Sequence, residues 1–288
     1  MLQLFIWGKI MEKDDIEFWR EVSYQIIDEV GEAVSPLVGK EKSGETVKMG
    51  ADGTPTKMID VVAEEKVIKL LKNTGKSVTL VSEEIGELKI GKGPSEVVFV
   101  VDPLDGTVNA LKNIPFYGIS IAIADSAIKP LNSLTLRDIE IGFVKNLATG
   151  DLYQAIKGNG ASLNGENTVP SSREDITGSL IGAYVRGAMT KMNEICKTVK
   201  RIRLLGSVAT ELCYVADGTY DAFLDIRGNL RVVDIAAAKL IVEEAGGTVT
   251  NEHGKSLDNK LNVTERTSII AACNLNVHKD IINITEVL

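Results

Sequence analysis

Apolar residues recur at helical spacing in two segments near the start of the chain, residues 14–38 and residues 56–73. Apolar positions three or four residues apart predict an amphipathic helix with one buried face. These positions are Phe18, Val22, Ile26, Ile27 and Val30 in the first segment, and Ile59, Val62, Val67, Leu70 and Leu71 in the second. Residues 40–56 between them are polar and rich in glycine, lysine and threonine, which predicts a mobile loop.

Short apolar runs then predict the strands of a large sheet, because β-branched and aromatic residues fill them between polar turns. The runs are residues 77–82, 97–101, 119–124, 139–146 and 151–156. Gly158-Asn159-Gly160 follows the last run, but Leu163 stands where a dinucleotide-binding fingerprint needs its third glycine. The glycines therefore predict a hairpin or loop turn.

Strand and helix patterns alternate again in the second half of the chain. The patterns predict strands at 179–185 and 221–225, and helices at 189–199, 207–216 and 233–245. Asp234 suits the start of the last helix, and Gly246-Gly247 suits its end. On size grounds we expect two α/β halves, residues 1–175 and 176–288.

Composition narrows the class of partner. With 288 residues and 44% apolar content the chain can bury one large core or two adjoining cores, and its net charge of -8 argues against nucleic acid or an anionic membrane. An odd number of cysteines without metal-site spacing (Cys196, Cys213, Cys273) predicts buried free thiols and a reducing cytoplasm. The apolar segment 2–7 is too short for a signal peptide or a membrane span. Met11 is an alternative start, which would leave residues 1–10 as a poorly ordered extension.

The segment Asp102-Pro103-Leu104-Asp105-Gly106-Thr107 carries the clearest chemistry. It directly follows the buried run 97–101, so a strand ends by presenting two carboxylates, a glycine and a hydroxyl at one point. Such a cluster suits hard divalent cations and a phosphate. A purely structural Asp-Gly turn would explain the glycine but neither the second aspartate nor the threonine.

Further carboxylates stand at the ends of predicted strands or in the first turns of predicted helices. They are Asp60, Glu83 and Asp234. Each has a plain alternative, because Asp60 and Asp234 also suit helix N-terminal dipoles and Glu83-Glu84 also suits a solvated pair. Buried together, these groups would raise one another's pKa unless cations occupied the cluster.

Three segments resemble the signature segments of the inositol monophosphatase family, which belongs to the lithium-sensitive, Mg²⁺-dependent phosphatases. They are Ser82-Glu83-Glu84, Asp102–Thr107 and Val233-Asp234-Ile235-Ala236-Ala237. Residues 50–56 and 227–234 are similar to the archaeal branch, whose members hydrolyse both fructose 1,6-bisphosphate and inositol monophosphates. Val233 replaces the tryptophan that usually precedes the last metal-binding aspartate, which fits the archaeal type.

The resemblance implies a layered αβαβα sandwich, a homodimer, and two to three Mg²⁺ ions per active site, with Mn²⁺ as a substitute. The implied metal ligands are Asp60, Glu83, Asp102, the Leu104 carbonyl, Asp105 and Asp234, with Asp60 at a third, weaker ion. Most of these ligands fall in the first half, and the last falls in the second half with the substrate contacts.

In the implied mechanism Thr107 and Glu83 position the nucleophilic water, Asp105 completes the catalytic set, and the Gly106 and Thr107 N–H groups bind phosphate oxygens. Only two histidines are present, so a water made acidic by bound metal would replace a protein base.

A bisphosphate substrate needs a second anion site, and arginine's planar fork suits phosphate. Four arginines of the second half are candidates: Arg186, Arg203, Arg227 and Arg231. The resemblance favours Arg203 and Arg227 with the Val208 backbone, and it puts Asp225 where animal enzymes of the family have a sugar-binding glutamate. Exposed surface arginines are the alternative.

Three other functions stay open. A haloacid-dehalogenase-type phosphatase needs its two aspartates two residues apart, whereas Asp102 and Asp105 are three apart. A 3′-phosphoadenosine 5′-phosphate phosphatase of the same superfamily would share all the metal residues. A non-catalytic metal- or phosphate-binding regulatory protein is disfavoured, because every residue of the implied metal and water site is present.

Overall fold

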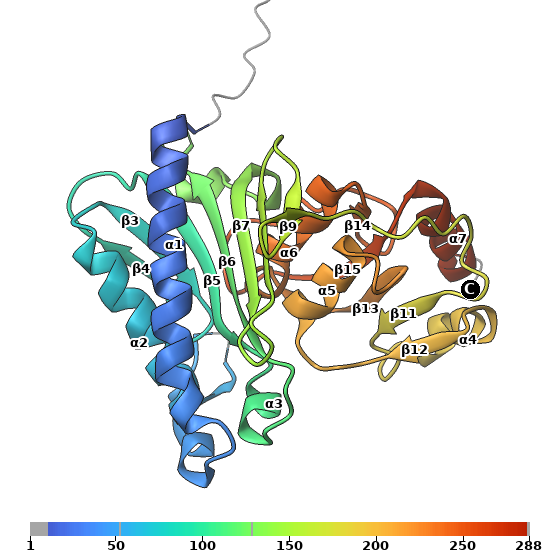
Figure 1. Cartoon of the computed structure of the whole chain (residues 1–288), viewed down its shortest axis with the longest axis horizontal. Coiled ribbons are helices and arrows are strands. Elements are labelled where there is room, and N and C mark those ends of the chain that lie inside the picture. The colour runs from blue at the N-terminus through green and yellow to red at the C-terminus, as the bar shows by residue number, and fades with distance from the viewer. Residues whose placement is uncertain (1–10, 52, 128, 287–288) are drawn as a thin grey trace, which may run out of the picture.

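Two sheets alternate with three layers of helices in this computed structural model (Figure 1). It describes residues 11–51, 53–127 and 129–286, so the segment 2–7 and the extension 1–10 lie outside the described residues. Helices α1 and α2 cover the outer face of the large sheet, α5 and α6 lie between the two sheets, and α4 and α7 cover the far side of the small sheet. The predicted αβαβα sandwich is confirmed.

The large sheet has eight strands in the order β10-β9-β8-β7-β6-β5-β3-β4. Its strands are β3 (Val78–Ser82), β4 (Gly86–Ile90), β5 (Val97–Asp105), β6 (Gly118–Asp125), β7 (Ile139–Asn146), β8 (Leu152–Ile156), β9 (Ala161–Leu163) and β10 (Glu166–Asn167). Strands β3 and β5 run parallel and the other neighbours run antiparallel. All nine residues of β5 are buried because helices cover both faces of this central strand.

The small sheet has five strands in the order β12-β11-β13-β15-β14. Its strands are β11 (Leu180–Ala183), β12 (Arg201–Arg203), β13 (Ala222–Arg231), β14 (Thr248–Thr250) and β15 (Arg266–Ala272). The large sheet thus uses residues before the predicted boundary at 175/176 and the small sheet uses residues after it. The division into two halves stays a prediction, because α5 and α6 share one hydrophobic core with both sheets.

The helices differ in how much of their surface is buried. Their bounds are α1 (Lys13–Val34), α2 (Met58–Asn73), α3 (Thr107–Leu111), α4 (Met189–Thr198), α5 (Val208–Ala216), α6 (Val232–Ala245) and α7 (Leu275–Glu286), with 3-10 turns η1 (Ser35–Leu37), η2 (Glu41–Gly44), η3 (Leu131–Ser133) and η4 (Leu136–Asp138). Helix α1 buries one face, as its period predicts, whereas α6 is buried nearly all round between the sheets. Close approach requires Gly142 on β7, because a Cβ there would lie 2.9 Å from the Ala237 carbonyl of α6.

The prediction of an irregular loop at residues 40–56 is wrong, because part of this segment forms strands. Strands β1 (Thr46–Met49) and β2 (Pro55–Lys57) pair there as an antiparallel hairpin. All four β1 residues are exposed, so the alternation of Val47 and Met49 with polar residues spans only four positions and faces no core. The strands β9, β10, β12 and β14 were not predicted either, because two or three residues are too few to show a period. No helix among the described residues has the length and apolar character needed to cross a membrane.

Candidate active site

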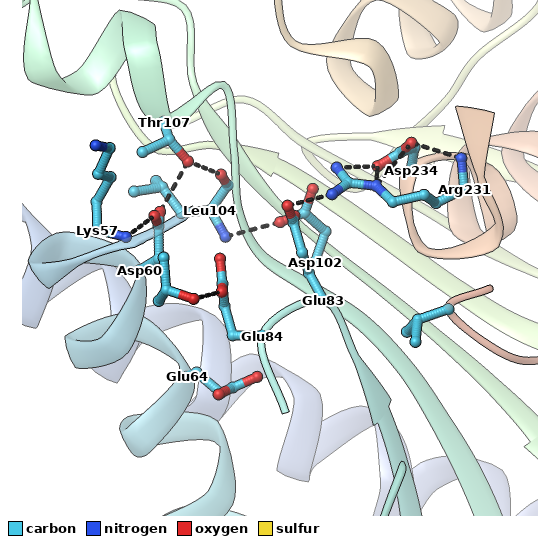
Figure 2. Close-up of polar contacts among 12 residues, drawn as sticks. Lys57, Asp60, Glu64, Glu83, Glu84, Asp102, Leu104, Thr107, Arg231 and Asp234 are labelled. Carbon is cyan, nitrogen blue, oxygen red and sulfur yellow. Dashed lines mark hydrogen bonds and ion pairs between the residues drawn. The ribbon is translucent and has the colours of Figure 1, made fainter. Parts of the chain in front are cut away.

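Three carboxylates from separate parts of the chain meet at one edge of the large sheet (Figure 2). Glu83 directly follows β3, Asp102 lies on the parallel neighbour β5, and Asp234 lies in the first turn of α6. One oxygen from each carboxylate lies within 4.8 Å of the others. Parallel strands bring their carboxyl ends to the same edge, which is why Glu83 and Asp102 become neighbours.

The Asp102–Asp105 segment bends where it leaves the sheet. Its register with β6 shifts between Asp102 and Asp105, because Pro103 has no N–H to donate to the ladder. The Leu104 N–H donates to Asp102 Oδ1 at 3.1 Å. This irregularity lets Asp102 and Asp105 face the same cavity although they are three residues apart.

The carboxylates carry more negative charge than their surroundings neutralise. Burial, followed by the nearby Asp234 charge, raises the pKa of Glu83 to about 8 despite its ion pair with Arg231. Burial and the charges of Glu83 and Asp105 raise the pKa of Asp102 well above its usual range. Buried carboxylate oxygens that cannot all ionise unaided fit a divalent cation, which would neutralise them and complete its shell with water or phosphate.

Asp105 is held by the start of α5 rather than by the other carboxylates. Its Oδ2 accepts from Ser207 Oγ and the Ala209 N–H, both at 2.7 Å, and its Oδ1 accepts from the Val208 N–H at 3.1 Å. Burial raises the pKa of Asp105 to about 6, although these donors oppose the rise. The Val208 N–H, predicted as a substrate contact, thus donates to a carboxylate of the site.

Thr107 contacts Asp60, not Glu83 (Figure 2). Its hydroxyl lies 2.7 Å from Asp60 Oδ1 and 3.1 Å from the Leu104 carbonyl, and Asp60 Oδ2 also accepts from the Lys57 N–H at 3.1 Å. Burial raises the pKa of Asp60. Gly106, with a φ of 91°, turns the chain from β5 into α3 just before Thr107.

Sequence reasoning missed two further buried acids beside Asp60. Glu84 accepts from the Thr56 hydroxyl of the hairpin, and Glu64 of α2 accepts from the Ile85 N–H at 3.0 Å. Burial raises the pKa of Glu64, although Lys48 lies 3.8 Å away. Glu64 lies one helical turn after Asp60, a spacing that places both on one face of α2 and was the available signal.

Arg231 also belongs to the site, although the sequence analysis favoured Arg203 and Arg227 over it as substrate contacts. It ends β13 and inserts its guanidinium between carboxylates, pairing through Nη1 with Glu83 and through Nη2 with Asp234 Oδ1 at 2.8 Å (Figure 2). Its backbone N–H donates to Asp234 Oδ2 at 2.8 Å, which caps the start of α6. Arg231 lies three residues before Asp234, and this helix-start spacing brings their side chains together.

A cavity of about 400 Å³ opens beside the carboxylates. Arg227, Arg231 and Arg266 are on its lining, together with Tyr184 and both aspartates of the motif. Gly106, Thr107 and Val208 line it too, as does Asn229. Of the predicted substrate residues, Arg203 and Asp225 are missing from the described lining. Arg203 is exposed and donates to the Ile202 carbonyl at 3.0 Å.

Asp225 and Arg227 form a tight pair at the cavity. Arg227 Nε and Nη2 donate to Asp225 Oδ1 and Oδ2 at 2.8 Å and 2.6 Å, and Asp225 is fully buried. The Arg227 guanidinium also stacks 4.0 Å from the centre of the Tyr184 ring. Both Asp225 oxygens therefore position Arg227, and the guanidinium faces the cavity over the ring.

A cavity lined by arginines beside clustered carboxylates suits an enzyme that acts on phosphate esters with the help of a metal ion. The chain belongs to the inositol monophosphatase family, whose model matches residues 15–286. The predicted family is confirmed, and with it the class of phosphoric monoester hydrolase.

Similar proteins agree with the archaeal type. A fructose-1,6-bisphosphatase/inositol-1-monophosphatase from Methanothermobacter thermautotrophicus is 54% identical over 96% of this chain and 100% of its own. A bifunctional NADP phosphatase/NAD kinase from Methanocaldococcus jannaschii is 42% identical over 91% of this chain and 49% of its own. A solved structure from Pyrococcus horikoshii, described as similar to inositol-1 monophosphatase, has a TM-score of 0.79 at 37% identity and covers 93% of this chain and 98% of its own.

Proposed function

We propose that the chain is a Mg²⁺-dependent phosphatase that hydrolyses fructose 1,6-bisphosphate and inositol 1-phosphate by attack of water. The convergence of Glu83, Asp102 and Asp234 beside a cavity with three arginines carries the proposal. The Methanothermobacter relative is named for both activities and aligns over its full length, which supports the same two substrates.

Glu83, Asp102 and Asp234 would hold the principal Mg²⁺, with Asp105 and the Leu104 carbonyl completing the ligands of two ions. Asp60 would serve a third, weaker ion, and Mn²⁺ would substitute for Mg²⁺. Bound metal supplies a more acidic attacking water and neutralises charge on the phosphate. The raised pKa values of Glu83 and Asp102 support this assignment, because they show how poorly these carboxylates tolerate charge without a cation.

The chain's own residues orient the water and its proton. The Thr107 hydroxyl, 2.7 Å from Asp60 Oδ1, is suited to hold the attacking water and to pass a proton to Asp60. Burial raises the pKa of Asp60, which makes its carboxylate a better proton acceptor. Glu83 would contact the same water from the other side. The N–H groups of Gly106 and Thr107 would bind phosphate oxygens at the start of α3.

Two arginines are candidates for binding the second phosphate of a bisphosphate substrate. Arg227, oriented by Asp225 and Tyr184, is suited to the distal phosphate of a bisphosphate. Arg203 is the other substrate contact that the resemblance favours, and the Arg203→Ala variant tests it separately. An unchanged ratio of activities on fructose 1,6-bisphosphate and inositol 1-phosphate in that variant would remove Arg203 from the site.

Phosphate-release kinetics with and without Mg²⁺ test the function. The substrates are fructose 1,6-bisphosphate, inositol 1-phosphate, 3′-phosphoadenosine 5′-phosphate and NADP. We expect Mg²⁺-dependent release from the first two. Preference for the third would establish the alternative phosphatase, and release from none of them would favour a non-catalytic binding protein.

We also propose a cytoplasmic homodimer. All three cysteines are free in the structure, which supports a reducing compartment. Light scattering of the purified chain tests the dimer: a mass near twice 31.1 kDa is expected, and a monomer at micromolar concentration would refute it.

A further inference from the structure

Arg231 brings a cation into the group of carboxylates that would hold the metal. Its guanidinium pairs with Glu83 through Nη1 and with Asp234 through Nη2, and Nε lies 3.1 Å from Asp234 Oδ1. The Arg231 side chain is 20% exposed, so water shields these contacts little. Glu83 and Asp234 are two of the three carboxylates whose oxygens converge.

Both oxygens of Asp234 are engaged by this single residue. Oδ1 accepts from Nη2 at 2.8 Å and from Nε, while Oδ2 accepts from the Arg231 backbone N–H at 2.8 Å and lies 3.3 Å from Nε. The backbone contact caps α6 and can persist when a ligand binds. A metal ion that takes Oδ1 would displace the guanidinium contacts, because Oδ1 already accepts from both Nε and Nη2 and because two cations in contact repel each other.

We propose that Arg231 is the counter-cation of the metal-free site and competes with the divalent metal for Asp234 and Glu83. The inference rests on the proposed metal site. It assigns metal loading a defined rearrangement: the guanidinium leaves the carboxylates while the backbone of Arg231 stays in the helix cap. The adjacent cavity already has Arg231 on its lining, so the displaced guanidinium would enter the space where a substrate phosphate would lie.

Mn²⁺ binding to the purified, metal-stripped full chain tests the competition. Free Mn²⁺ is counted by electron paramagnetic resonance, with no substrate present. The variant Arg231→Met keeps the side-chain length and removes the charge. We expect it to bind the first Mn²⁺ at least about tenfold more tightly than wild type, because one hydrogen bond to a charged group corresponds to about a factor of ten.

Arg266→Met is the matched control. Arg266 pairs with Arg231 across β13 and β15 and lines the same cavity, but it donates to the backbone carbonyls of Val263 and Glu265. Losing its charge should change Mn²⁺ affinity by no more than about twofold at physiological salt, where exposed charges are screened. A similar gain in both variants would indicate a general charge effect and overturn direct competition.

The outcomes separate the two proposals. Absence of Mn²⁺ binding by wild type would refute the proposed metal site. Binding by wild type with equal or weaker affinity in a folded Arg231→Met variant would overturn only the role of Arg231. If Arg231→Met does not fold, NMR of wild type labelled with ¹⁵N-arginine tests the competition instead. The Arg231 Nε–H resonance is assigned by its absence from the spectrum of Arg231→Lys. We expect its chemical shift to change when Mg²⁺ saturates the protein. An unmoved resonance with bound Mg²⁺ would overturn the competition.

Discussion

Glu211 offers a direct test of how burial controls charge in this protein. It lies fully buried in α5, and its Oε2 accepts from the N–H groups of Leu205 and Gly206, both at 3.0 Å. Its Oε1 lies 3.4 Å from the Tyr220 hydroxyl. Burial raises the pKa of Glu211 to about 7, even though these donors oppose the rise. Its hydrogen-bond donors among the described residues are two backbone N–H groups and one hydroxyl, all uncharged, so no cation offsets its charge directly.

The variant Glu211→Gln keeps the contacts and removes the charge. The amide oxygen can replace Oε2 as acceptor for both N–H groups, and the amide NH₂ can donate to the Tyr220 oxygen. An acid whose pKa is higher in the folded than in the unfolded chain binds its proton more tightly when folded. The folded state is therefore most favoured below pH 4.5, and this stability is lost as the pH rises towards 7.

The magnitude follows from the two pKa values. The pKa of Glu211 is 4.5 in the unfolded chain and about 7 in the folded chain. Wild type therefore loses roughly 2.5 kcal/mol of its free energy of unfolding between pH 5 and pH 8.5. Glu211→Gln should not lose this amount. Urea unfolding at both pH values, with EDTA present, measures the free energy of unfolding. The difference between variant and wild type should shift by roughly 2.5 kcal/mol in favour of the variant at pH 8.5.

Glu244 supplies the matched control. It also accepts from two backbone N–H groups, those of Gly158 at 2.8 Å and Gly160 at 2.9 Å, but it is partly exposed. Glu244→Gln removes one negative charge from a partly exposed position, so it controls for the loss of a charge as such, and an equal pH-dependent gain in this variant would point to net charge rather than to burial at Glu211. Parallel pH profiles for Glu211→Gln and wild type would refute the reasoning, since burial at Glu211 would then not oppose its ionisation.

Three other predictions concern the metal site and the packing. Asp105→Asn should lower Mg²⁺-dependent phosphate release by about 100-fold or more while circular dichroism stays unchanged, and near-normal turnover would contradict a ligand role. Mg²⁺ affinity, measured by calorimetry, should rise at least about tenfold from pH 6.5 to 8.5, because Glu83 must lose a proton whose pKa is raised to about 8; a flat profile would count against Glu83 as a ligand. Gly142→Ala should lower the free energy of unfolding by about 1–3 kcal/mol, because its Cβ would lie 2.9 Å from the Ala237 carbonyl. In the same urea assay Gly31→Ala in α1 should be neutral or stabilising, since its Cβ would lie 3.4 Å from Leu147, and equal losses in both would refute the packing argument.

The sequence by itself determined most of the long elements, although not β15 or α7, and the chemical type of the site. The strand at 97–101 and the helix at 233–245 are present as part of β5 and as α6, because apolar periodicity depends only on neighbouring residues. The two carboxylates of the Asp102–Asp105 motif likewise face one cavity. Residue type and short-range spacing sufficed for these, since a strand end and a bend position both side chains locally.

The tertiary structure decided which distant residues meet. Thr107 contacts Asp60 of α2, and Asp105 is held by the start of α5, more than 100 residues away. Arg231, not Arg203, reaches the carboxylates. These contacts depend on strand order and on the direction of each side chain, neither of which local periodicity encodes. Local spacing at the start of α6 brings Arg231 to Asp234, but its contact with Glu83 depends on how α6 packs against the large sheet.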